Sequence, residues 1–311
     1  MRPYLGLFGT LLLAAACAGT ARARDNWPRV VHSRDGTPIS YEVQGIGEPD
    51  LVFVHGWSCD SRYWREQVPH FSRHHRVIVL DLAGHGHSGF QRRKYDMASF
   101  GEDVQAVMEA AGSRRAVLIG HSMGGSVIAE AARLLPGKVV GLIGVDTLEN
   151  VEYPLTSEAA ENMIAPLRED FSAGVRKFVQ SMLRPSTDPE LAEWIAADMA
   201  SASPRVALSA MKEMLVQYVT GAAAKVFEAV RLPVVVVNGD LWPIDYEANR
   251  RHMLSFDAIV LKNSDHFLML DRPEEFNRAL EAAIGMVTGK GRKEPSGWKP
   301  LLRAGGTAAK E

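Results

Sequence analysis

The sequence predicts an α/β protein with a mostly parallel β-sheet and helices on both of its faces. Strand-like apolar runs alternate with helix-like stretches along most of the chain, which is typical of such a sheet. Val234–Val237 is a run of four valines, the composition of a strand covered on both faces. Residues 148–231 lack a convincing strand, so we expect a helical cap to be inserted there.

The strands of the core are expected at residues 27–147 and 232–288, on either side of the cap. The turn-forming pair Asp35-Gly36 precedes the first clear run and indicates a hairpin, so the sheet should open with an antiparallel pair. The predicted strands are Ile39–Gln44, Leu51–His55, Arg76–Asp81, Ala116–Gly120, Val139–Val145, Pro233–Asn238 and Ala258–Leu261.

The cap region is rich in Ala, Met, Glu and Leu, and its prolines are expected to mark helix boundaries. Its apolar positions have the spacing of helix faces that pack together. A mainly apolar, Met-rich cap favours an uncharged small or acyl substrate. The five prolines are Pro154, Pro166, Pro185, Pro189 and Pro204.

Composition excludes several classes of protein. The chain has 311 residues, enough for two domains or for one α/β domain with a large insertion. Its 35 Lys and Arg residues nearly balance 37 Asp and Glu residues, so no basic surface for nucleic acid is expected. The only cysteines are Cys17 and Cys59, and the first lies in a segment expected to be removed. The mature chain would then form no internal disulfide. No feature of the sequence indicates an oligomeric state.

The two ends are expected to lie outside the folded domain. Residues 1–23 read as a signal peptide, with an apolar run from Leu5 to Ala18 followed by small residues. That run is shorter than the roughly 20 residues of a membrane-spanning helix, so we expect an exported protein, periplasmic or secreted, without a membrane span. A weak lipoprotein box leaves a lipid anchor at Cys17 as the alternative. Residues 289–311 are expected to form a flexible tail.

The strongest chemical signal is a G-x-S-x-G motif at residues 120–124, directly after an apolar strand and before a helix predicted over Val127–Leu135. A nucleophile at a sharp strand-to-helix turn has strained backbone angles, and flanking glycines keep Cβ atoms out of the bend. The motif therefore predicts Ser122 as a nucleophile. The helix N-terminus behind it would let the Met123 amide face a developing oxyanion.

Two further groups are needed beside this serine. The loop after the strand Leu51–His55 offers the backbone amide of Trp57 as a second oxyanion donor. Among ten histidines, His266 is the predicted base, because it follows the last strand and precedes a helix over Glu274–Ile284.

The other histidines near these motifs are expected to be structural. His55 should shape the loop after its strand, and His85 and His87 should fix a Gly-rich turn by hydrogen bonds. His85, His87 and His121 lack the i,i+4 helical pair or cysteine partner of a metal site, so no metal is expected.

Taken in order, the motifs HGW, DLAGHGHSG, GHSMGG and DHFLMLDRPEEF resemble the α/β-hydrolase superfamily, in its serine-nucleophile, esterase/lipase-like branch, from about Val30 to Val287. The resemblance implies an α/β-hydrolase fold with an eight-stranded sheet and a helical cap after strand six. It also implies a Ser–His–acid triad in which Ser122 forms an acyl-enzyme and His266 transfers the protons. Such chemistry needs no metal or organic cofactor.

The triad acid departs from the family pattern. The position after strand seven that carries the acid in many members holds Trp242. Asp146, at the end of strand six, is the preferred acid, with Asp240 and Asp245 as alternatives. A second departure is Asp265, directly before the histidine, where the family usually has Gly.

The sequence thus predicts an exported serine hydrolase that cleaves carboxylic esters of small or acyl substrates through Ser122, His266 and Asp146. A serine-dependent hydrolase of carbon–carbon, thioester or lactone bonds is the first alternative. The second is a noncatalytic ligand-binding protein of the same fold. The retained serine, histidine and both oxyanion loops favour an enzyme, because binding alone does not require them.

Overall fold

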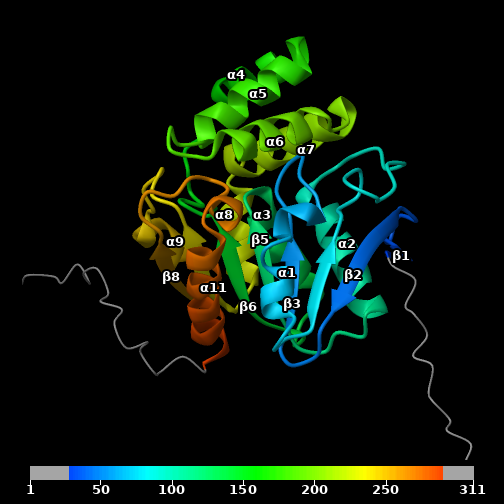
Figure 1. Cartoon of the computed structure of the whole chain (residues 1–311). Helices are drawn as coiled ribbons and strands as arrows, with labels where there is room; N and C mark the ends of the chain where they lie inside the picture. Colours follow the sequence, from blue (N-terminus) through cyan, green and yellow to red (C-terminus); the bar gives the residue numbers. More distant parts are fainter. Residues whose placement is uncertain (1–27, 290–311) are drawn as a thin grey trace, which may run out of the picture.

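The computed structural model describes residues 28–289, and these form an eight-stranded sheet covered by helices (Figure 1). The strand order is β1-β2-β4-β3-β5-β6-β7-β8. β2 pairs antiparallel with both β1 and β4, and every other pair is parallel. The predicted fold class is therefore confirmed. The strands are β1 Arg29–His32, β2 Pro38–Gln44, β3 Asp50–Val54, β4 Val77–Leu80, β5 Ala116–His121, β6 Val139–Val145, β7 Pro233–Asn238 and β8 Ser255–Val260.

The apolar runs form central strands because both faces of the sheet are covered. β3, β4 and β5 are buried along their whole length. In Figure 1 α1 and α11 lie in front of the sheet, and α2 and α3 lie behind it. The short elements η1 and α1 follow β3. The core helices are η1 Ser61–Trp64, α1 Val68–Phe71, α2 Met97–Ala110, α3 Met123–Leu134, α8 Ala222–Ala229, α9 Tyr246–His252, α10 Leu268–Asp271 and α11 Pro273–Thr288.

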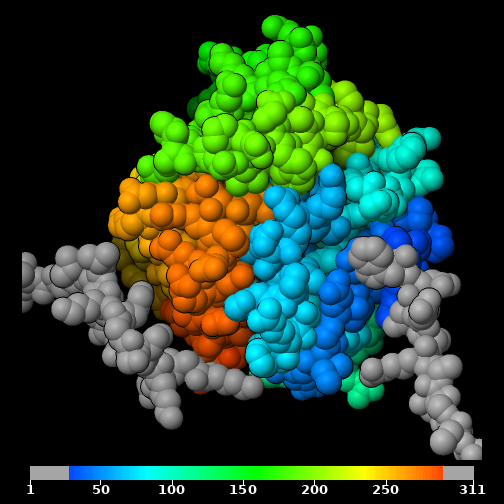
Figure 2. Space-filling view, in the orientation of Figure 1, coloured from blue at the N-terminus to red at the C-terminus, as the bar shows by residue number. Residues whose placement is uncertain are grey.

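Four helices between β6 and β7 lie together beyond the carboxyl ends of the parallel strands, and we call them the cap helices (Figure 1). On the face drawn in Figure 2 they sit directly on the core segments that follow β3 and β8. The cap helices are α4 Ser157–Glu169, α5 Phe171–Met182, α6 Pro189–Ala200 and α7 Pro204–Val219.

Several predicted boundaries were wrong. β8 begins at Ser255 rather than Ala258, and the helix predicted over Glu274–Ile284 runs from Pro273 to Thr288. Pro166 lies inside α4, not at its boundary. It falls in the last turn, where the lost N–H removes one hydrogen bond and the helix still closes through the bond from the Asp170 amide to the Pro166 carbonyl. α3 begins at Met123 rather than Val127. Its first residues include two glycines, which have low helix propensity and no apolar pattern, so the sequence pattern missed the first turn.

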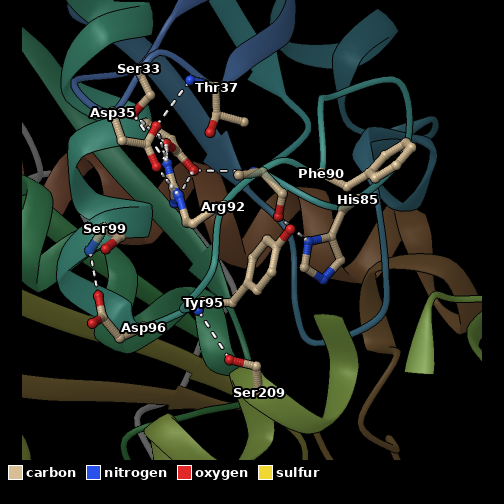
Figure 3. Close-up of polar contacts among 12 residues, drawn as sticks. Ser33, Asp35, Thr37, His85, Phe90, Arg92, Tyr95, Asp96, Ser99 and Ser209 are labelled. Atoms are coloured by element: carbon tan, nitrogen blue, oxygen red, sulfur yellow. Dashed lines mark hydrogen bonds and ion pairs between the residues drawn. The ribbon is translucent and has the colours of Figure 1, made fainter. Parts of the chain in front are cut away.

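A buried arginine fixes the long loop after β4 (Figure 3). The Arg92 guanidinium donates to Asp103 on α2 at 2.5 Å and to Asp35 in the β1–β2 turn at 2.7 Å. Ser33 donates its hydroxyl to the same Asp103 carboxylate at 2.6 Å. Farther along the loop, the Tyr95 amide donates to the hydroxyl of Ser209 on α7 at 3.1 Å. One loop therefore joins the sheet edge, a core helix and the cap helices.

The predictions for the chain ends lie outside the described residues: the signal peptide over residues 1–23, the lipid anchor at Cys17, and, apart from Gly289, the tail over residues 289–311. Within residues 28–289, no helix is both long and apolar enough to cross a membrane.

Candidate active site

Ser122 is the single residue between the end of β5 and the start of α3, where the chain turns sharply. Its backbone angles, φ 52° and ψ −119°, lie outside the regions that most residues adopt. Glycines on both sides make the turn possible. A Cβ atom on Gly120 would lie 2.3 Å from the Gly124 carbonyl oxygen, and one on Gly124 would lie 2.7 Å from the Val54 oxygen. The G-x-S-x-G spacing is thus required by the close approach of three backbone segments.

The loop after β3 lies against this turn. A Cβ atom on Gly56 would lie 3.2 Å from the Ser122 Cβ, so the loop passes the serine in direct contact. Trp57 follows, with its indole buried and its Nε1 donating to the Ala207 carbonyl on α7 at 2.8 Å. Met123 opens α3 directly after the serine. Backbone amides of Trp57 and Met123 therefore belong to the two segments that flank Ser122.

His266 and Asp146 form a buried pair across the ends of β6 and β8. The His266 Nδ1 lies 2.6 Å from the Asp146 Oδ2, and both side chains are buried. The other Asp146 oxygen accepts the Gly239 amide at 2.7 Å. The histidine backbone is held on both sides, because its amide donates to the Met182 carbonyl and its carbonyl contacts the ring of His121 at 3.0 Å.

This pairing fixes the imidazole. With Nδ1 donating to a carboxylate, Nε2 is the nitrogen left for a reacting group. Among the hydrogen bonds of residues 28–289, none joins the Ser122 hydroxyl to this ring. Catalytic hydrogen bonds are often long without substrate and shorten when it binds.

The two alternative acids are occupied elsewhere. Asp240 forms an ion pair with Arg184 at 2.6 Å. Asp245 caps α9 by accepting the Ala248 amide at 2.9 Å. Trp242, at the position where many family members carry the acid, packs edge-on against the His266 ring with centroids 5.7 Å apart. Of the three candidate carboxylates, only Asp146 is brought to the histidine.

Asp265 shapes the loop that carries His266. It accepts the Thr187 hydroxyl at 2.5 Å and the Phe267 amide at 2.8 Å, and it is fully buried. The left-handed residue of this loop is Asn263, with φ 55°. The carboxylate directly before His266 is thus used in local hydrogen bonds to the cap region and the loop.

The remaining histidines have structural contacts. The Nδ1 of His55 donates to the Gly56 carbonyl at 2.8 Å, and its Nε2 accepts the Leu82 amide at 3.0 Å. The His121 ring packs against the His266 ring, with the ring centroids 4.7 Å apart. Burial holds the pKa of His121 well below its usual range. His87 faces the Asp81 carboxylate at 3.4 Å. Residues 28–289 contain no group of three His, Cys, Asp or Glu side chains placed to hold a metal ion.

Two residues beside Asp146 were missed by the sequence analysis. The Asn238 side chain accepts a hydrogen bond from the Thr147 amide at 3.3 Å and donates one to the Thr147 carbonyl at 3.0 Å, which fixes the residue after Asp146. It also donates to the Glu149 carboxylate at 3.3 Å. Burial and the nearby Asp146 charge raise the pKa of Glu149 to about 7. No local pattern marks these contacts, because they join residues about ninety positions apart.

Comparison with known proteins identifies the family of the chain and several similar proteins. Residues 51–279 match the sequence pattern described as the Alpha/beta hydrolase family. The chain is similar to a pimeloyl-[acyl-carrier protein] methyl ester esterase of Edwardsiella ictaluri, 35% identical over 146 residues that cover 45% of this chain and 55% of the relative. It is also similar to a non-heme chloroperoxidase of Streptomyces lividans, 40% identical over 125 residues that cover 39% and 45%. The matched segment spans about half the length of these curated relatives.

Solved structures resemble a larger part of the chain. An esterase from Thermogutta terrifontis has a TM-score of 0.71 and 24% identity, with 83% of this chain and 98% of that one covered. An esterase from Exiguobacterium antarcticum has a TM-score of 0.72 and 19% identity over the same shares. At this level of identity the likeness shows the fold.

Proposed function

Because the chain belongs to the α/β-hydrolase family, we propose that it is a serine hydrolase that cleaves carboxylic esters of small or acyl substrates. The observation that carries the proposal is the 2.6 Å contact between His266 and Asp146, at the sheet edge that also holds the strained Ser122. Pure ligand binding requires neither the strained serine nor the buried histidine–carboxylate pair.

In the proposed reaction the Ser122 oxygen attacks the ester carbonyl carbon while the His266 Nε2 takes its proton. Asp146 holds the ring through Nδ1 and stabilises the charged imidazolium. The negative charge that develops on the carbonyl oxygen is met by the backbone N–H groups of Trp57 and Met123. The intermediate then expels the alcohol, which receives the proton from His266.

The resulting acyl-enzyme is hydrolysed by the same groups in reverse order. His266 removes a proton from water, the hydroxide oxygen attacks the acyl carbon, and the Ser122 oxygen leaves and regains a proton. Neither half of this reaction needs a metal or an organic cofactor.

Two features support an apolar acyl substrate. The Trp57 ring packs edge-on against Phe171 and Phe178 of α5, with centroids 6.4 and 5.7 Å apart, so aromatic cap residues stand over the oxyanion loop. The similar protein from Edwardsiella ictaluri is named for a methyl ester substrate. The proposal also includes export through residues 1–23, with a lipid anchor at Cys17 as the alternative, and the mass of the mature protein distinguishes the two.

The test is hydrolysis of p-nitrophenyl esters of increasing acyl length by the wild type and single variants. Ser122→Ala and Asp146→Asn should each lower kcat by at least about a hundredfold, because each removes part of the proton-transfer system. Asp240→Asn is the matched control and should keep kcat within about threefold, since its carboxylate pairs with Arg184.

Either of two results would contradict this assignment. If Asp146→Asn kept its rate while Ser122→Ala lost it, another carboxylate would be the acid. If the wild type hydrolysed no ester in the series, carbon–carbon, thioester or lactone cleavage, or ligand binding without catalysis, would become the better reading.

A further inference from the structure

A polar cavity of about 260 Å³ lies at the junction of the core and the cap helices. It is lined by three segments: the chain from Ser58 to Arg62, the Gly-rich turn around His85, and the turn between α6 and α7. Neither Ser122 nor His266 lines it, and the function proposed above makes no use of it.

Two residues that line this cavity each carry a buried polar atom that has no hydrogen-bond partner among the described residues. These atoms are the Ser58 hydroxyl and the His85 Nε2, on residues that are only 5% and 6% exposed. Buried polar atoms in folded proteins are nearly always hydrogen-bonded, because an unpaired one loses its interaction with water without replacement. Two such atoms on residues that line one cavity point to a group that binds there.

The free nitrogen of His85 is an acceptor. Its Nδ1 lies 3.1 Å from the Ala83 carbonyl and must donate to it, so Nε2 carries the lone pair. Burial lowers the pKa of His85 to about 3, so the ring stays neutral near pH 7. Figure 3 shows the ring with one nitrogen in a hydrogen bond and the other without one. A ligand that meets Nε2 must therefore donate a hydrogen bond.

The charges on the wall are negative overall. The Asp60 and Asp198 carboxylates both pair with the single guanidinium of Arg62, which leaves a formal charge of −1 among these three groups. The helix ends do not change this sign, because α6 ends and α7 begins beside the cavity and their partial charges oppose each other. A cation is therefore favoured over an anion.

We propose that this cavity binds a small molecule through a primary ammonium group. Such a group has three N–H donors and a positive charge, which match the lone pair of His85, the Ser58 hydroxyl and the surplus carboxylate charge of Asp60 and Asp198. The volume admits a ligand of several heavy atoms. The loop after β3 lies beside the Ser122 Cβ at Gly56 and lines the cavity two residues later, at Ser58. A ligand in the cavity would therefore contact the same loop that carries the Trp57 amide.

Calorimetric titration with 2-aminoethanol at pH 7 tests this site, with ethylene glycol as the neutral analogue that carries a hydroxyl in place of the ammonium. The wild type should bind 2-aminoethanol with a dissociation constant on the order of 1 mM and at least about tenfold more tightly than ethylene glycol. Ser122→Ala should bind it as the wild type does, so the result is independent of ester hydrolysis.

Variants of the wall complete the test. Asp198→Asn should weaken 2-aminoethanol binding at least about fivefold, and Ser58→Ala should weaken it about threefold. Glu193→Gln, which removes a charge from an exposed position of the same helix, should leave binding unchanged. The proposal is overturned if ethylene glycol binds as tightly as 2-aminoethanol, if no saturable binding occurs below about 100 mM, or if folded Asp198→Asn and Ser58→Ala both bind like the wild type.

Discussion

The residues at the candidate active site adopt backbone conformations that are rare elsewhere. Ser122 and Asp146 both have positive φ, 52° and 44°, although neither is glycine. Each follows the end of a central parallel strand, where the chain must turn sharply and still point a side chain along the sheet edge. Such strain persists only where neighbouring contacts fix it. For Asp146 those contacts are its amide bonded to Val237 and its carboxylate bonded to the Gly239 amide.

Glu149 is the residue beside this site whose ionisation should alter folding stability. Its pKa in the folded chain is about 7, raised by burial and by the Asp146 charge, against 4.5 for an ordinary glutamate. As pH rises from 4.5 to 7 the unfolded chain loses this proton first, so the free energy of unfolding falls over that range. A shift of this size corresponds to about 3 kcal/mol at most, and partial solvent exposure of the carboxyl reduces it.

Glu149→Gln keeps a neutral side chain at every pH, so the variant should not show this fall in the free energy of unfolding as pH rises. The stability gain of the variant over the wild type should be near zero at pH 4 and reach about 1–3 kcal/mol at pH 8. Urea unfolding at a series of pH values measures it. Glu109→Gln, an exposed change on α2, should show no such trend. A gain that did not grow between pH 4 and pH 8 would contradict the raised pKa.

The proposed nucleophile and base were easier to predict from the sequence than the residues that support them. Ser122 lies in a local pattern of strand, two glycines and helix, and His266 is placed by its order along the chain. Asp146 required elimination, because several carboxylates follow strands and only tertiary contacts show which one meets the histidine. Asn238 and Glu149 lie outside any local pattern, since their partners come from another strand end.

At the level of whole elements, buried parallel strands were predicted most accurately. The predicted ranges Val139–Val145 and Pro233–Asn238 equal those of β6 and β7. Continuous apolar composition identifies such strands without any knowledge of their neighbours. β1 was anticipated only through its turn, because an edge strand with alternating exposure has a weak pattern. Helix limits near glycine and proline were predicted least well, since packing can override propensity there.

Pro166, inside α4, allows a test of whether packing outweighs low helix propensity. It has no N–H, so the Asn162 carbonyl four residues earlier loses its helical partner. Pro166→Ala should restore that bond and raise the free energy of unfolding by about 1 kcal/mol. Pro189→Ala is the matched control, because Pro189 occupies the first turn of α6, where proline is tolerated.

Thermal unfolding of both variants measures the difference. We expect a higher Tm for Pro166→Ala and an equal or lower Tm for Pro189→Ala. An unchanged or lower Tm for Pro166→Ala would indicate that contacts of the proline ring outweigh the lost hydrogen bond.

On the scale of the whole molecule, the loop after β4 connects parts of the fold that are distant in sequence. Arg92 joins it to the β1–β2 turn and to α2, while its own carbonyl accepts from Arg205 of α7 at 3.1 Å. Arg205 also donates to the Phe90 carbonyl. The same loop begins at the Gly-rich turn around His85, so its contacts link the β1–β2 turn and α2 to α7 (Figure 3).

The buried pair within this network should contribute much more to stability than an exposed pair nearby. Arg92 and Asp103 are 4% and 0% exposed, so Arg92→Met would leave the Asp103 carboxylate buried without its charged partner. We expect a loss of about 3–5 kcal/mol in the free energy of unfolding. Arg34→Met, which removes an ion pair to Glu102 from a side chain that is 78% exposed, should cost less than about 1 kcal/mol.

The double variant Arg92→Met with Asp103→Leu separates the ion pair from the packing around it. Replacing both charges by apolar groups removes the unpaired carboxylate, so the double variant should recover at least about half of the stability lost by Arg92→Met. Because Asp103 also accepts the Ser33 hydroxyl and the Ala83 amide, recovery should stay incomplete. Denaturant unfolding of the four proteins measures the cycle. A double variant no more stable than Arg92→Met would show that Asp103 acts mainly through those two hydrogen bonds, and that the loop is held by them and not by the buried charge pair.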